Sequence, residues 1–348
     1  MMVYVLIAVF PVLLGYFFPQ LNNNKTQKKQ FYLFCGTVLL FVMGFRHYSL
    51  GSTDTLNYYN AMRRAVASSS LQSYLTDVYE VGSQLFIYLL SRIFEEPQWL
   101  LIVTSAIYII SVFYFVDRNC DDIPMSISVY ITFGLFAFHM QGMRQSLAMC
   151  ICLFAYEQAK KRHLFRFILI LMFAMAFHQT AILFAPIYFL IGMRYSRKNI
   201  GIMLGASAVV LLFADRILSW ANNLFDRNYI SAVDSGGVIT LFINILIILI
   251  ILLYDRRLKE GNEQTPFLFI AIICALCYAF RYVGSNMAAR VSYYFAFAQI
   301  ALVPRTKLMV VAKQRDWYRL LLLTVSVVYY IYHLNATGFL PYKFFWQV

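Results

Sequence analysis

The sequence has few charged residues: Asp, Glu, Lys and Arg together make up only 13% of its 348 residues. Hydrophobic residues make up 61%, and the mean hydropathy is +0.66. This composition excludes an ordinary soluble domain. Because apolar runs near the roughly 20 residues needed to cross a bilayer recur along the chain, the sequence predicts an all-α, polytopic integral membrane protein.

Cysteine is too scarce and too buried to build a disulfide framework. The chain has six cysteines, and all but Cys120 lie within apolar runs. Cys274 and Cys277 have the C-x-x-C spacing of many metal sites, but no second pair and no nearby His completes such a site. We interpret the cysteines as small buried hydrophobic residues.

The signature motifs of several enzyme classes are absent as well. The sequence contains no Walker A loop, no G-x-S-x-G, no H-E-x-x-H and no D-x-D. It therefore does not support nucleotide hydrolysis or zinc chemistry, and it gives little support to a metal-dependent sugar-nucleotide mechanism. We expect no cofactor and no bound metal.

The charges that are present are mostly basic, with 29 Lys and Arg against 16 Asp and Glu. The excess lies in short loops between apolar runs, at 25–29, 160–166, 194–198, 256–259 and 305–319. Clusters of Lys and Arg in short loops mark the cytoplasmic side of a membrane protein and contact anionic lipids. We therefore expect lipid headgroups, and not nucleic acid, as the partner of these basic residues.

These loops define a topology of roughly twelve spans in a single domain, 1–348. The expected spans are 2–19, 31–45, 98–116, 123–141, 144–158, 164–178, 180–193, 200–214, 238–254, 266–281, 288–303 and 318–333. An outer amphipathic segment, 46–97, separates the second span from the third, and 215–237 forms a second outer loop. Counting the apolar run 85–94 as a span would place the basic loop 160–166 outside, so we interpret 85–94 as re-entrant or interfacial.

The same topology brings two polar breaks to one face. If the loops 160–166 and 194–198 are both cytoplasmic, the chain between them crosses and returns, which places His178 at the outer face. The runs on either side of Arg144 form a second pair, with Arg144 at its outer turn. An Arg and a His are thus expected to meet on the side opposite the basic loops.

Further ionisable residues end up at this outer face. They are Arg46, Asp54, Arg144, His178, Arg281 and Arg290, with Tyr58, Gln145 and Tyr293 near them. Each Arg near the hydrocarbon region costs about 2.5–3.5 kcal/mol on insertion scales, so several on one face indicate an anion site. Guanidinium groups bind phosphate oxygens in pairs and stay charged. A lipid diphosphate entering from the bilayer is the ligand that such a site would suit.

Simpler interpretations exist for most of these residues. Arg46, Arg281 and Arg290 could extend their side chains to the outer headgroups. Asp54 could cap the helix that follows it, which is compatible with a catalytic role. His178 could be a turn residue that is hydrogen-bonded to a carbonyl.

Three segments around these residues carry recognisable motifs. They are FRHYSLGSTDTLNYY (45–59), GMRQSLAMCICLFAYEQAKKRHLFRFILILMFAMAFHQTAILFAPIYFL (142–190) and AARVSYYFAF (288–297). With these elements the chain resembles the EpsG family of exopolysaccharide proteins, which is related to Wzy-type O-antigen and capsule polymerases. The matching features are Arg then Gly-[Ser/Thr]-Asp and Tyr, Arg-Gln-x-x-Ala with a downstream Phe-His, and a late Arg-x-x-x-Tyr.

The resemblance implies a GT-C-like polymerase in the bacterial plasma (inner) membrane. Such an enzyme transfers a growing glycan from one undecaprenyl diphosphate carrier to a second lipid-linked repeat unit at the outer face. It could work with a chain-length regulator and a flippase of the same pathway. We expect an inverting, metal-independent reaction.

In that reaction Arg144 and Arg290 would stabilise the leaving diphosphate, helped by Arg46 and Arg281. Either His178 or Asp54 would be the base, and the sequence does not decide between them. The alternatives are a glycan ligase or membrane acyltransferase, and a non-enzymatic flippase or transporter of lipid-linked sugars. A transporter should show inverted repeats, which the sequence lacks.

Overall fold

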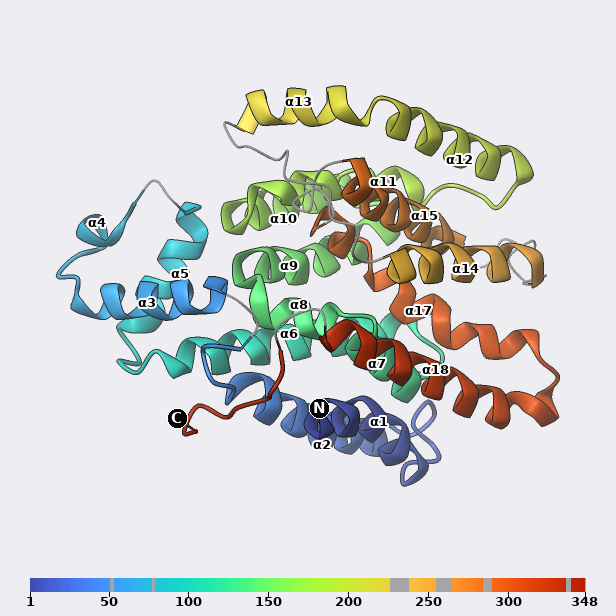
Figure 1. Cartoon of the computed structure of the whole chain (residues 1–348), viewed down its shortest axis with the longest axis horizontal. Helices are drawn as coiled ribbons and strands as arrows, with labels where there is room; N and C mark the ends of the chain where they lie inside the picture. The colour runs from blue at the N-terminus through green and yellow to red at the C-terminus, as the bar shows by residue number, and fades with distance from the viewer. Residues whose placement is uncertain are drawn as a thin grey trace.

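The chain folds into a layered bundle of helices (Figure 1). The computed structural model describes residues 1–50, 53–76, 79–225, 238–254, 265–283, 290–335 and 339–347. Within these ranges the only β pairing is an isolated bridge between Arg46 and Phe344. The predicted all-α fold is therefore confirmed for the described part of the chain.

Two N-terminal helices form one edge of the bundle: α1 (Met2–Tyr16) and α2 (Lys25–Gly44). The side chain of Asn24 accepts hydrogen bonds from the backbone N–H groups of Thr26 and Gln27, so it caps α2. Helix α1 packs on α7 (Ile123–Thr132), and α2 packs on α6 (Gln98–Asn119).

Between α2 and α6 lie three helices that gather at one end of the bundle, at the left of Figure 1. They are α3 (Thr53–Ala67), α4 (Leu71–Tyr74) and α5 (Val81–Ser91). The 11 residues of α5 extend about 16 Å, roughly half the thickness of a hydrocarbon core. The assignment of 46–97 as an outer, partly re-entrant segment stays a prediction.

Helices α6, α8, α9 and α10 form the centre. Helix α7 continues into α8 (Leu135–Gln141) after a bend of 52°, and Gly134 at the bend has φ +87°. α9 (Met143–Lys160) and α10 (Leu164–Phe177) are antiparallel neighbours joined by the short basic loop.

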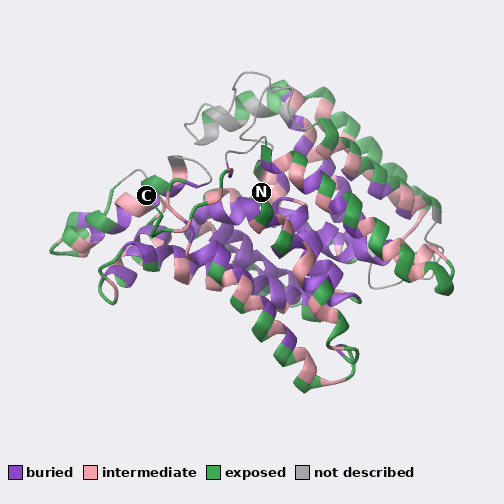
Figure 2. Ribbon diagram, turned by 60° about the horizontal axis from the view of Figure 1, so that its bottom comes forward, coloured by how far each residue is buried: buried purple, intermediate pink, exposed green. Residues whose placement is uncertain are grey.

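The second half of the chain covers the other side of the centre. It consists of the 3-10 helix η1 (Gln179–Phe184), α11 (Ile187–Leu190), α12 (Arg197–Leu212), α13 (Ala214–Phe225), α14 (Val238–Tyr254), α15 (Thr265–Ala279), η3 (Phe280–Val283), η4 (Ser292–Tyr294), α17 (Phe297–Arg305), η5 (Thr306–Met309), η6 (Ala312–Gln314) and α18 (Arg315–Asn335). Buried residues concentrate in the middle of the bundle, while α12 and α13 lie at its edge (Figure 2). The segment predicted as the outer loop 215–237 includes most of α13, and 226–237 lies outside the described residues.

Helix length is the main difference from the predicted spans. Among the described residues, α6 alone is long and apolar enough to cross a membrane, and α7 with α8 qualifies only as a bent pair. Several other expected spans correspond to apolar helices of only 10–17 residues, among them α1, α10, α14 and α15, or are broken. The run 180–193 becomes η1 and α11, and the described part of 288–303 becomes η4 and α17. One reason is Pro186, which has no backbone N–H to donate and interrupts the helix between η1 and α11.

Candidate active site

Polar contacts mark the two ends of the central helix α6. At one end Lys160 donates to the side chain of Asn119 at 2.8 Å, and Lys28 pairs with Asp117 at 2.9 Å. At the other end Gln98, at the start of α6, donates to the carbonyl of Gly44 at 2.7 Å. The 22 residues of α6 separate these ends by about 33 Å.

Arg144 lies at the end remote from the basic loops, in the first turn of α9. A cation is disfavoured at a helix N-terminus, where the helix dipole is positive. The position therefore needs a compensating acid. Its Nη1 atom forms an ion pair with Oε2 of Glu80.

His178 ends α10 at the same end of the bundle. Its backbone leaves the helix in an extended conformation (φ −158°, ψ 118°), and its N–H group donates to the carbonyl of Ala174 at 3.1 Å. The imidazole Nδ1 lies 3.1 Å from Oε1 of Glu80. The ring is thus paired with a carboxylate, whereas the simpler interpretation from the sequence was a carbonyl partner.

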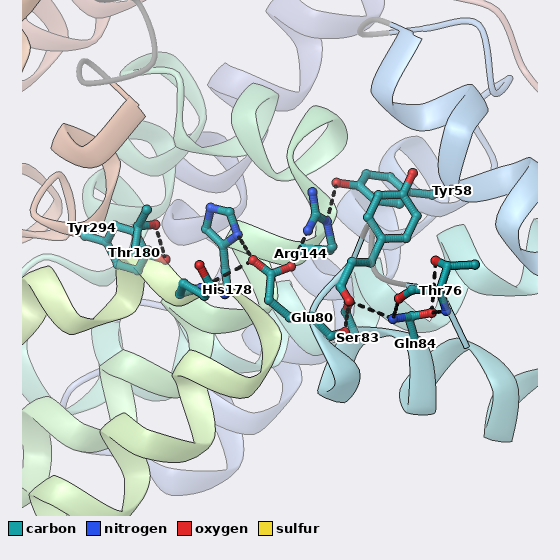
Figure 3. Close-up of polar contacts among 11 residues, drawn as sticks. Tyr58, Thr76, Glu80, Ser83, Gln84, Arg144, His178, Thr180 and Tyr294 are labelled. Carbon is teal, nitrogen blue, oxygen red and sulfur yellow. Dashed lines mark hydrogen bonds and ion pairs between the residues drawn. The ribbon is translucent and has the colours of Figure 1, made fainter. Parts of the chain in front are cut away.

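Glu80 lies between Arg144 and His178 (Figure 3). Its side chain is 6% exposed, and those of its two partners are each 15% exposed. The backbone N–H of Gln179 also points to Oε1, at 3.4 Å. Burial alone would raise the pKa of the Glu80 carboxyl, but the hydrogen bond from His178 and the charge of Arg144 outweigh it and lower this pKa to about 2.

The loop that carries Glu80 is itself held in place. Gln84, 2% exposed, donates through Nε2 to the carbonyls of Thr76 at 2.8 Å and Tyr79 at 2.6 Å. Its Oε1 accepts from the backbone N–H of Thr76 at 2.8 Å, and the Ser83 hydroxyl donates to the Glu80 carbonyl at 2.7 Å. These bonds determine where the Glu80 backbone enters α5.

Close packing of α5 on α10 brings this loop to His178. A Cβ at Gly82 would lie only 2.6 Å from the carbonyl oxygen of Ala176. The backbones of α5 and α10 could not come this close with any other residue at position 82. Glycine there lets Glu80, two residues earlier, reach the end of α10.

Two tyrosines complete the surroundings of Arg144. Its guanidinium lies 4.5 Å above the ring of Tyr79, in cation–π geometry. Its Nε donates to the hydroxyl of Tyr58 at 3.4 Å. The guanidinium is therefore held on three sides by Glu80, Tyr79 and Tyr58.

A second ion pair lies next to this cluster and is more open. Arg290 Nη1 is 3.5 Å from Oδ2 of Asp54, and their side chains are 47% and 34% exposed. Asp54 lies one turn before Tyr58 on α3, and Gln145 Nε2 donates to the carbonyl of Arg290 at 2.8 Å. The two ion pairs thus form one continuous polar site between α3, α5, α9 and the segment that begins at residue 290.

The model of the EpsG family matches residues 29–344, a range that includes every residue of this polar site. The chain belongs to the EpsG family. No curated protein and no solved structure matches the chain. Membership of the EpsG family indicates a polysaccharide polymerase of exopolysaccharide biosynthesis.

Two further candidate residues of this EpsG-family protein, Arg46 and Tyr293, contact other parts of the bundle. Arg46 is 3% exposed and donates to the carbonyls of Met43, at the end of α2, and Met140, at the end of α8. Tyr293 stacks on Phe138 with ring centroids 4.0 Å apart. The side chain of Arg281 lies outside the described residues.

A cavity lies elsewhere in the EpsG-family bundle. It measures about 390 Å³ and is lined by the α1–α2 loop, the α6–α7 turn, Lys307 and Arg319. This is the basic end, remote from Glu80. No group of three or more His, Cys, Asp or Glu in the described ranges is arranged to hold a metal ion.

Sequence reasoning missed Glu80 and Tyr79. Spacing along the chain gives no link between Glu80 and its partners, because Glu80 is 64 residues from Arg144 and 98 from His178. One signal was present: Glu80 directly precedes the apolar run of α5, in a segment already placed at the outer face.

Proposed function

We propose that this EpsG-family chain is a multi-pass membrane polymerase that acts on lipid-linked oligosaccharides at the outer face of the bacterial plasma membrane. One observation carries the proposal: Arg144 and His178, from the ends of two neighbouring helices, share the carboxylate of Glu80 beside the more exposed Arg290. This combination supplies cations for a diphosphate and a base for a hydroxyl.

The helix surfaces support a membrane environment. Large apolar side chains face outward at the periphery, among them Phe189 at 74% exposure, Leu212 at 81% and Leu253 at 73%. Helix α12 is apolar yet contains no buried residue. Extended apolar surface of this kind needs lipid or a protein partner to cover it. The basic loops would face the cytoplasm, and Glu80 with its partners the outside.

The chemistry follows from the charges. The acceptor hydroxyl oxygen attacks the anomeric carbon of the donor glycan, and the bond from that carbon to the diphosphate oxygen breaks. The electron pair of this bond goes to the leaving diphosphate, where Arg144 and Arg290 stabilise the developing charge. The hydroxyl proton goes to a base. Direct attack of this kind inverts the anomeric centre, and the cations that it uses are guanidinium groups.

The geometry favours His178 over Asp54 as that base. With Nδ1 occupied by Glu80, the second ring nitrogen, Nε2, is the one that can take the proton. Asp54 instead pairs with Arg290 and would hold that guanidinium in position. A positioned base contributes roughly 10²–10⁴-fold to the rate.

The other residues fit supporting roles. Tyr58 holds Arg144, and Gln145 holds the backbone of Arg290. The ring of Tyr293, which stacks on Phe138, would offer a surface for a sugar. Arg46 would act from beneath the site, since its guanidinium joins the ends of two helices. The partial negative charge of helix C-termini favours a cation there. Arg281 stays a proposed diphosphate contact. A flippase and a chain-length regulator of the same pathway are proposed partners.

Reconstitution tests this function. Purified protein in proteoliposomes is supplied with undecaprenyl-diphosphate-linked repeat units of a bacterium that carries this chain, and products are separated by size. We expect a ladder of polymers from the wild type and none from Arg144→Ala or His178→Ala. Arg64→Ala is the matched control, because Arg64 is an exposed cation on α3 away from the cluster.

Two results would argue against the proposal. A wild-type product that stops after a single transfer would indicate a ligase. Polymers of normal length from both Arg144→Ala and His178→Ala would remove the site from catalysis.

A further inference from the structure

Glu80 contacts two different groups with its two carboxylate oxygens. Oε2 pairs with Arg144, while Oε1 accepts from Nδ1 of His178 (Figure 3). In the proposed function these two residues have separate tasks. Arg144 stabilises the leaving diphosphate, and His178 takes the proton of the acceptor hydroxyl. The Glu80 carboxylate therefore contacts one residue from each half of the proposed reaction.

Each of the two ion pairs of the polar site places a carboxylate beside a guanidinium group. Arg144 pairs with Glu80 and Arg290 pairs with Asp54, so two guanidinium groups face two carboxylates. A diphosphate carries at least two negative charges of its own. It cannot bind closely to Arg144 without competing with the Glu80 carboxylate for the same guanidinium, because like charges repel strongly where water is scarce.

The contact with His178 is of the kind that prepares a base. A carboxylate on Nδ1 fixes the tautomer with the proton on that nitrogen, and leaves the lone pair on Nε2. After Nε2 takes a proton from the acceptor hydroxyl, the ring becomes a cation that the carboxylate stabilises. A carboxylate that also pairs with Arg144 stabilises the imidazolium less than a carboxylate that faces the imidazole alone.

We propose that Glu80 is a positioning residue that changes partners during the reaction. Before the donor binds, Glu80 holds Arg144 and orients His178. When the donor binds, the diphosphate takes over Arg144, and the Glu80 charge then acts on His178 alone. Activation of the base is thereby coupled to the presence of the leaving group. This inference rests on the proposed polymerase function.

The rigid support of Glu80 fits this role. Its backbone is held by Gln84 and Ser83, and the approach of α5 to α10 is set by Gly82. A carboxylate on such a fixed backbone can keep contact with His178 while Arg144, which has a longer side chain, turns toward the ligand. The movement needed is one side chain and not a helix.

The test uses Glu80→Gln, which keeps the shape of the side chain and removes its charge. We expect kcat for polymerisation to fall about 10²–10⁴-fold, because the imidazolium loses its counter-ion. We also expect the KM for the lipid-linked donor to fall roughly tenfold, because the diphosphate no longer competes with a carboxylate for Arg144. Glu80→Asp keeps the charge at a shorter reach and should recover part of kcat.

A direct binding measurement separates this inference from the function on which it rests. The affinity of detergent-purified protein for sugar-free undecaprenyl diphosphate is measured for the wild type, Glu80→Gln and the control Glu95→Gln, an exposed carboxylate. Tighter binding by Glu80→Gln alone supports the competition for Arg144. Equal or weaker binding by a folded Glu80→Gln protein overturns it, whether or not the wild type polymerises.

The expected effect of Glu80→Gln on kcat can fail independently of the binding result. If the wild type polymerises and Glu80→Gln keeps the wild-type kcat, Glu80 does not orient His178 and the proposal is wrong, although the polymerase function stands. If the wild type makes no polymer while Glu80→Gln binds undecaprenyl diphosphate more tightly, the proposed function fails and the partner exchange at Arg144 survives.

Discussion

Acidification should weaken this protein through the carboxyl group of Glu80. The pKa of Glu80 is about 2 in the folded protein, against an ordinary value of 4.5. A group whose pKa is lowered by folding stabilises the folded state fully above its unfolded pKa, and that contribution is lost as the pH falls toward the folded value. The critical window is therefore pH 4.5 down to about 2.

The size of the effect follows from the two pKa values. A difference of about 2.5 pKa units corresponds to roughly 3 kcal/mol at 1.36 kcal/mol per unit. The side chain is 6% exposed, so little of this is screened by solvent. Glu80→Gln removes the charge, so it should lose about this amount at pH 7 and show a correspondingly flatter acid dependence.

The assay is unfolding of the purified protein in detergent, followed at several pH values between 7 and 3. The wild type, Glu80→Gln and the exposed-carboxylate control Glu95→Gln are compared. We expect the gap between wild type and Glu80→Gln to shrink as the pH falls, while Glu95→Gln follows the wild type. A constant gap, or no gap at pH 7, would refute the ion-pair geometry around Glu80.

Four other predictions concern the site and the bundle. Arg144→Lys should lose most activity in the polymerisation assay, because an ammonium cannot contact Glu80, Tyr58 and a phosphate as the planar guanidinium does; normal activity would reduce its role to charge. Gly82→Ala should separate Glu80 from His178, since its Cβ would lie 2.6 Å from a carbonyl of α10, and should lower kcat more than protein yield. Gly134→Ala should destabilise folding by about 1–2 kcal/mol without changing KM, because φ is +87° there. Polymerisation should continue in EDTA, and restoration only by added divalent metal would contradict the guanidinium mechanism.

Much of the arrangement of the site was predictable from loops alone. The basic loop between α9 and α10 makes these helices antiparallel, so Arg144 at the start of one and His178 at the end of the other share an end of the bundle. Charge in loops is a local property of the sequence, which is why the meeting of Arg144 and His178 at one end could be predicted. The pairing of Asp54 with Arg290 also lies at this end, as the candidate residues were expected to.

Helix lengths were harder to predict. Hydropathy predicts where apolar residues occur, but it does not report how the backbone runs through them. The apolar run after His178 is a 3-10 turn followed by the short helix α11, and the run before Arg144 is bent at Gly134. Such breaks depend on single residues and on what packs against them.

Composition and the placement of charge in the sequence determined the helical class, the polarity of the bundle and the end at which arginine and histidine meet. Only the tertiary structure decided which carboxylate pairs with Arg144 and His178. Glu80 reaches its partners across 64 and 98 residues, through a loop held by Gln84 and a glycine contact between α5 and α10. Periodicity and charge describe each segment by itself, whereas such a contact exists only when two distant segments pack.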